Sequence, residues 1–125
     1  MTTALLHARA YQASTALTAT PGQLVVQLYD GAARFLLQGR HALAQGDLPR
    51  ASERLGRGED IIDELLAVLD LSAGEVAEHL QSLYLFSKRQ LFDARLSRDP
   101  EKVDDVIGVL AELREGWAGV LRAVG

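Results

Sequence analysis

The sequence predicts an all-α protein, an antiparallel up-down-up-down four-helix bundle with an N-terminal arm. After residue 20, apolar residues recur at steps of three and four, which is the period of helices buried on one side. The breaks between these segments are only about two to five residues long, so consecutive helices should pack as antiparallel neighbours. No segment shows the period-two alternation of a strand.

The first helix should begin at Thr20 and Pro21 and run to about Gln45. Proline suits the first helical position, and Thr20 with Gln23 has the spacing of a capping box. A glycine then ends this helix, and Asp47 should cap the next one. These signals place the first two helices as a hairpin.

The second helix has an unbroken three-and-four pattern of apolar residues or glycine, at positions 48, 51, 55, 58, 62, 65 and 69. Gly56 and Gly58 each weaken a helix by about 1 kcal/mol relative to alanine. We therefore interpret these glycines as places where a neighbouring helix approaches closely.

The third helix should begin at a second capping box, Ser72 with Glu75. Its apolar residues are Val76, Leu80, Leu83, Tyr84, Leu91 and Ala94. Asp99 and Pro100 then supply a cap and a first residue for the fourth helix, with apolar residues or glycine at 103, 106, 110, 113, 117, 120 and 124. We interpret the apolar positions of helices two to four as core, with Trp117 the largest.

The first helix carries more apolar surface than one face requires. Its core stripe includes Tyr29, but Val26, Ala33 and Leu37 form a second stripe roughly 180–220° around the helix from Leu24. This second stripe either packs permanently inside the protein or receives a partner. Tyr29 is either core or a partner contact.

We expect residues 1–19 to form a separate unit and residues 20–125 to form the bundle. The first unit has a few apolar residues, such as Tyr11, among many Thr, Ser and Ala. We expect it to be a mobile or loosely docked arm.

Composition argues against several classes of protein. The net charge is −4 and the basic residues are scattered, so a nucleic-acid binder is not expected. The chain has no cysteine and therefore no disulfide or thiolate metal site. No apolar run approaches the roughly 18–20 residues of a membrane span, and the N-terminus lacks a secretory signal. We expect a cytoplasmic protein without membrane insertion.

No catalytic, cofactor or metal site is evident in the sequence. A di-iron bundle needs Glu-x-x-His pairs on two helices, whereas Glu75 and Glu78 flank His79 at the wrong spacing. We therefore expect no enzyme, no cofactor and no metal. One alternative is a histidine phosphotransfer domain using His41 in 41-HALAQG-46, although the lysine typical of that motif is absent. A second alternative is a helical adaptor without a role in export.

Several strings occur together in a characteristic order. They are 10-AYQ-12, 17-LTATPGQL-24, 28-LYDGA-32, 61-IIDEL-65, the Leu80, Leu83 and Tyr84 group, and Trp117. This order resembles the FliS family of flagellar secretion chaperones over about residues 10–121. The resemblance implies a helical bundle that binds the disordered C-terminal segment of flagellin, prevents its premature polymerisation and aids its export.

The second stripe of the first helix and the resemblance together give the expected partner-binding residues: Tyr11, Val26, Tyr29, Ala33, Leu37, Leu83 and Tyr84. In the family, the arm and its tyrosine, here Tyr11, cover part of the binding surface when no client is present. The flagellar export apparatus and other flagellar regulators are further expected partners. Asp30, within the Leu-Tyr-Asp-Gly string, should stabilise a turn or pair with Arg34 one helical turn away.

Overall fold

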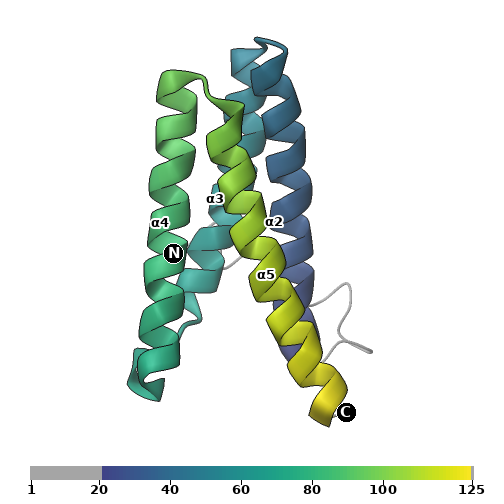
Figure 1. Ribbon diagram of the computed structural model, residues 1–125, viewed down its shortest axis with the longest axis vertical. Helices are drawn as coiled ribbons and strands as arrows, with labels where there is room; N and C mark the ends of the chain where they lie inside the picture. The colour runs from purple at the N-terminus through teal and green to yellow at the C-terminus, as the bar shows by residue number, and fades with distance from the viewer. Residues whose placement is uncertain (1–20, 125) are drawn as a thin grey trace.

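The computed structural model describes residues 21–124. It contains four long helices and one short 3₁₀ helix: α2 (Pro21–Ala44), α3 (Leu48–Ala67), η1 (Leu71–Ala73), α4 (Glu75–Ser97) and α5 (Pro100–Val124). The long helices run alternately up and down (Figure 1), which confirms the predicted all-α four-helix bundle. The predicted arm and the Thr20 cap lie outside the described residues.

Two of the predicted helix starts are confirmed by side-chain caps. The Asp47 carboxylate accepts a hydrogen bond from the backbone N–H of Arg50 at 3.2 Å, and α3 begins at the next residue. The Asp99 carboxylate accepts from the backbone N–H of Glu101 at 3.0 Å, at the start of α5. Each cap satisfies a donor that the first turn of a helix leaves unpaired.

The predicted capping box of Ser72 and Glu75 is wrong. The Asp70 carboxylate accepts both the backbone N–H of Ser72 at 3.0 Å and its hydroxyl at 2.6 Å. This local turn holds η1, and α4 begins only after Gly74, whose φ of 100° favours glycine. Ser72 therefore hydrogen-bonds to the neighbouring Asp70 and does not cap α4 as the capping-box motif predicted.

The α2 and α3 helices share the most extensive contact of any helix pair, and two glycines let them approach closely. A Cβ atom added at Gly58 would lie 2.6 Å from Leu36 Cδ2, and one added at Gly39 would lie 2.5 Å from Leu55 Cδ2. The close approach predicted at Gly58 is confirmed. At Gly56 that prediction is wrong, because an added Cβ there would meet nothing within 4 Å.

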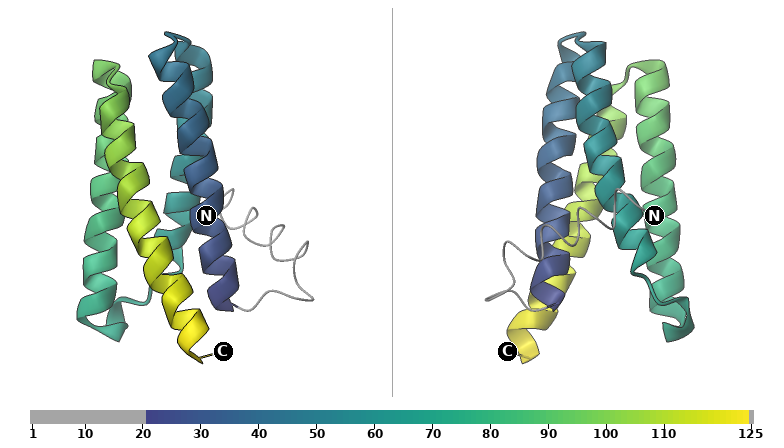
Figure 2. Two further views of the ribbon diagram at one scale, coloured as in Figure 1. Left: turned by 45° about the vertical axis from the view of Figure 1, so that its right-hand side comes forward. Right: turned by 180° about the vertical axis from the view of Figure 1, so that it is seen from behind.

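The core follows the predicted apolar register along most of the bundle. The fully buried side chains include Tyr29, Leu36, Leu55, Ile62, Tyr84, Leu91, Val103, Val106 and Leu110. The register fails at one end, where Val76 is 74% exposed and Val120 is 54% exposed. At that end the C-terminal half of α5 diverges from α4 (Figures 1 and 2), so a core position in the pattern is left at the surface.

Ion pairs link helices that are far apart in the sequence. The Arg40 guanidinium donates to both carboxylate oxygens of Asp104 at 2.8 and 3.0 Å, joining α2 to α5. Asp30 pairs with Arg114 of α5 at 3.0 Å. This interhelical pair replaces the one expected between Asp30 and Arg34. These four side chains are more than a third exposed, so each pair contributes little to stability.

Candidate partner-binding site

An apolar pocket lies at the end of the bundle where α5 diverges from α4. The cavity is about 260 Å³, and all four long helices contribute to it. Its lining includes Val25 of α2, Leu65 of α3, Val68 just after α3, Val76 and Tyr84 of α4, and Trp117 of α5. Each of these side chains is apolar or aromatic, so the pocket suits an apolar group of a partner.

The rim of this pocket is unusually apolar for a protein surface. Val68 and Val76 both line the cavity and are exposed. Leu71 of η1, three residues after Val68, is also exposed. Single exposed apolar side chains are common, but a cluster around a cavity marks an interaction site. The turn between α3 and α4 creates this cluster, because it places the end of one helix beside the start of the next.

Two buried tyrosines lie behind the pocket. The hydroxyl groups of Tyr29 and Tyr84 are hydrogen-bonded to each other, and their ring centroids are 6.5 Å apart. Burial raises the pKa of both phenols; hydrogen bonding to Tyr84 and Trp117 only partly offsets this for Tyr29. Both side chains are therefore neutral hydrogen-bonding groups at physiological pH.

We expect this tyrosine pair to make the stability of the bundle fall at alkaline pH. A phenol whose pKa is raised in the folded state favours folding below its unfolded pKa, 10.0 for tyrosine, and that contribution is lost as the pH rises further. We expect the free energy of unfolding, measured with denaturant, to fall as the pH increases above about 10. Tyr84→Phe should show a shallower fall. An identical pH profile in the variant would contradict this assignment.

The structure places the predicted partner-binding residues at several depths. Tyr29 and Tyr84 are buried and in contact, and Tyr84 also lines the pocket. On α2, Val26 and Ala33 are half-buried, whereas Leu37 is 53% exposed. The second stripe of α2 is therefore only partly covered by the described residues.

The two other predicted residues are less informative. Leu83 is half-buried on α4, and Tyr11 lies outside the described residues. Sequence reasoning missed Val68 and treated Val76 and Trp117 as core. The signal for Val68 was that it is an apolar residue at the end of α3, outside the three-and-four pattern of that helix.

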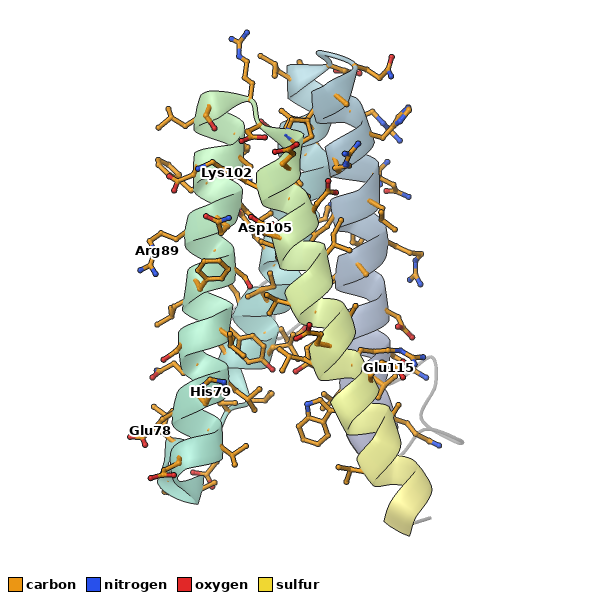
Figure 3. The ribbon with its side chains drawn as sticks, viewed as in Figure 1. Glu78, His79, Arg89, Lys102, Asp105 and Glu115 are labelled. Atoms are coloured by element: carbon orange, nitrogen blue, oxygen red, sulfur yellow. The ribbon has the colours of Figure 1, made fainter. Side chains whose placement is uncertain are left out.

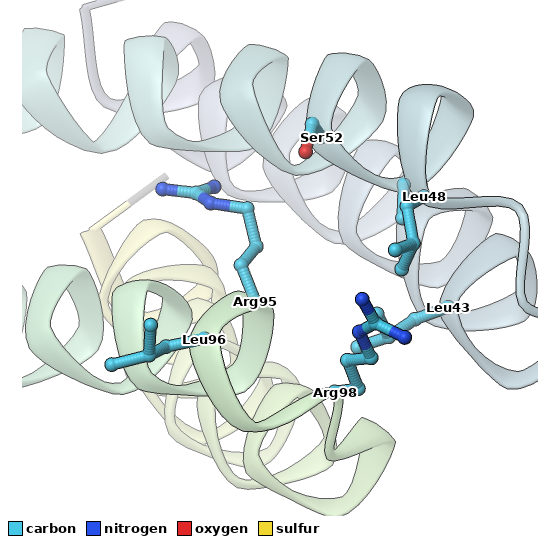
Figure 4. A pocket seen from close by; sticks show the side chains of 7 residues that line it. Leu43, Leu48, Ser52, Arg95, Leu96 and Arg98 are labelled. Carbon is cyan, nitrogen blue, oxygen red and sulfur yellow. The ribbon is translucent and has the colours of Figure 1, made fainter.

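A second, smaller cleft of about 210 Å³ lies at the opposite end of the bundle. It is lined by Leu43, Leu48, Ser52, Arg95, Leu96 and Arg98 (Figure 4). The Arg95 side chain extends from α4 toward α3, where it pairs with Glu59 at 2.9 Å. This cleft is more polar than the first pocket and has charged side chains at its edge.

The described residues contain no group of three or more acidic or histidine side chains that could hold a metal ion. Within this same part of the chain, no helix has the length and apolarity to cross a membrane. His41, the residue of the phosphotransfer alternative, is exposed near the end of α2.

An antiparallel helical bundle with an open apolar pocket is the architecture of a small helical binding protein. Comparison with known proteins is more specific. The family model described as "Flagellar protein FliS" matches residues 4–124. The chain belongs to the FliS family.

Three curated relatives illustrate the similarity. The chain is 38% identical to the flagellar secretion chaperone FliS of Vibrio cholerae over 100 residues, covering 79% of this chain and 74% of that protein. It is 38% identical to the Salmonella typhimurium chaperone over 106 residues, with coverages of 83% and 78%. It is 29% identical to the Bacillus subtilis chaperone over 114 residues, with coverages of 91% and 85%. These names favour the export-chaperone interpretation over the phosphotransfer and adaptor alternatives.

Proposed function

We propose that this protein binds the C-terminal segment of flagellin, prevents its premature polymerisation and helps deliver it for export. The observation that carries this proposal is the apolar pocket of about 260 Å³ with exposed Val68 and Val76 at its rim. An amphipathic client helix would insert an apolar side chain there, in the mode by which helices bind grooves. The protein would act as a stoichiometric binder, without catalysis.

The binding surface must extend beyond the pocket. Ordering a flexible segment has an entropic cost, which apolar burial offsets at about 25 cal/mol per Å². The second stripe of α2 supplies further apolar surface, because Val26 follows the pocket residue Val25 and Leu37 is exposed three turns along. We include Val26, Ala33 and Leu37 in the proposed surface, with Leu83 and the wall residue Tyr84.

The test is calorimetric titration with a peptide carrying the C-terminal segment of flagellin from the same organism. We expect saturable one-to-one binding with a negative change in heat capacity, the signature of apolar burial. A peptide of the same composition in scrambled order is the control. Equal heats from both peptides, or no binding by the folded protein, would contradict the proposal.

We also propose that residues 1–19 act as an arm that covers this surface in the absence of client, with Tyr11 as its apolar contact. A covering segment must be displaced by the client, which lowers the apparent affinity. The same titration with a chain lacking residues 1–19 should therefore give tighter binding. Unchanged or weaker affinity would count against the covering role.

A further inference from the structure

The smaller cleft, at the end of the bundle opposite the apolar pocket, combines apolar walls with a cationic edge. Leu43 near the end of α2 and Leu48 at the start of α3 line it, together with the buried Ala51. Leu96 of α4 also lines the cleft and is 75% exposed. An apolar side chain of a partner would therefore contact apolar surface on three helices.

The two arginines of the cleft differ in their partners. Arg95 pairs with Glu59 of α3, with 2.9 Å between a guanidinium nitrogen and a carboxylate oxygen. Arg98 is exposed, and its side chain extends across the cleft toward Leu43 and Leu48 (Figure 4). Its guanidinium forms no hydrogen bond or ion pair with the described residues. The five N–H donors of this group are therefore available to a partner.

The carboxylates nearest to this edge in the sequence are engaged elsewhere. Asp47 accepts a hydrogen bond from the backbone N–H of Arg50 at 3.2 Å, at the start of α3. Asp99 accepts from the backbone N–H of Glu101 at 3.0 Å, at the start of α5. The positive end of each helix dipole offsets the charge of its cap. The unpaired charge of Arg98 thus favours an anionic group supplied by another molecule.

The backbone at Arg98 gives a second reason to assign a role to this side chain. Arg98 ends α4 with φ 55° and ψ 45°, in the left-handed region. It is the only non-glycine residue with positive φ in the described part of the chain, where the others are Gly46 and Gly74. Glycine is the usual residue at such a helix end, because a Cβ atom makes this conformation unfavourable. An arginine in its place indicates that the guanidinium is used.

We propose that this cleft binds a helical segment of a second protein, which presents a leucine-sized apolar side chain and a carboxylate one helical turn apart. The apolar side chain enters between Leu43 and Leu48, and the carboxylate accepts two parallel hydrogen bonds from Arg98. The site is separate from the apolar pocket at the other end of the bundle. The proposal does not depend on the proposed binding of flagellin.

A nuclear magnetic resonance titration of the ¹⁵N-labelled protein tests the site. The probe is an alanine-based helical peptide with blocked ends, carrying leucine and glutamate one helical turn apart. We expect saturable shifts at Leu48, Ser52 and Leu96. A peptide with lysine in place of glutamate should bind about tenfold more weakly, the effect of losing one charge-assisted hydrogen bond. Equal affinities, no saturable shift, or shifts confined to the apolar pocket would overturn the proposal.

Charge reversal at the cleft provides a sharper test. Arg98→Glu should reverse the preference, so that the lysine peptide binds about tenfold more tightly than the glutamate peptide. Arg89→Glu is the matched control, because Arg89 lies on the same helix, points away from the bundle (Figure 3) and undergoes the same change of charge. This control should keep the preference of the unaltered protein. Reversal in both variants would indicate a general effect of charge and overturn the proposal.

Arg98→Gly separates binding from stability. Glycine adopts the left-handed conformation without strain, so the melting temperature should rise. The affinity for the glutamate peptide should nevertheless fall about tenfold, because the guanidinium is lost. A lower melting temperature would mean that Arg98 serves the fold, and an unchanged affinity would remove it from the site. Either result would contradict the proposal.

Discussion

Replacing Gly39 by alanine should lower the free energy of unfolding by about 1–3 kcal/mol. The added methyl group would lie 2.7 Å from Leu55 Cγ and 3.1 Å from the backbone nitrogen of the same residue. Leu55 is fully buried, so its side chain has no space into which it can move. The overlap outweighs the gain of about 1 kcal/mol that alanine normally brings to a helix. Denaturant unfolding followed by circular dichroism measures the change.

Gly56→Ala is the matched control for this experiment. It makes the same change on the neighbouring helix, where the new methyl group meets no atom within 4 Å. Here only the helix propensity changes, and stability should increase by up to about 1 kcal/mol. The two substitutions should therefore have opposite signs. A stabilised Gly39 variant would mean that α2 and α3 are not packed as closely as described.

The second large effect concerns client binding. Val76→Asp should weaken the affinity for the flagellin C-terminal peptide by about 10- to 100-fold. This range follows from the roughly 1.5–3 kcal/mol gained by burying a valine, at about 1.4 kcal/mol per tenfold change in affinity. Because Val76 is 74% exposed in the free protein, its melting temperature should change little. Titration calorimetry and thermal unfolding separate the two effects.

Ala111→Asp provides the comparison for this variant. Ala111 is exposed on α5 and does not line the pocket, so the variant adds the same charge elsewhere on the bundle. Its affinity for the peptide should equal that of the unaltered protein. Loss of affinity in both variants would indicate a general effect of charge, and retention of affinity in Val76→Asp would remove this part of the pocket from the binding surface.

Periodicity was sufficient to predict the helices because each one has a continuous buried face. The pattern from 48 to 69 predicted the core of α3, and all its positions are buried or half-buried. Local hydrogen bonding was harder to predict. Ser72 had the spacing of a cap, but Asp70 lay two residues away and accepted its hydrogen bonds. A capping-box motif considers only the spacing of two residues, so it cannot predict that a third side chain nearby will accept the hydrogen bonds instead.

The pocket could not be predicted from the register of single helices. Val76 occupies a core position in its own helix, yet it is exposed because α5 diverges from α4 at that level. The direction of one helix relative to another depends on packing over its whole length. The same limitation applies to Asp30, whose partner Arg114 is 84 residues away in the sequence. Family resemblance indicated Tyr84, which lines the pocket, but not Val68 and Val76 at its rim.

The order of the helices has a consequence for how fast the chain folds. Consecutive helices are joined by short turns and pack against each other, so most contacts close small loops. Proteins with such local contacts fold on microsecond to millisecond timescales. The packing of α2 against α5 is the exception, because it closes a loop that spans nearly the whole bundle. We therefore expect the three hairpins of consecutive helices to form rapidly, and the packing of α5 against α2 to complete the structure.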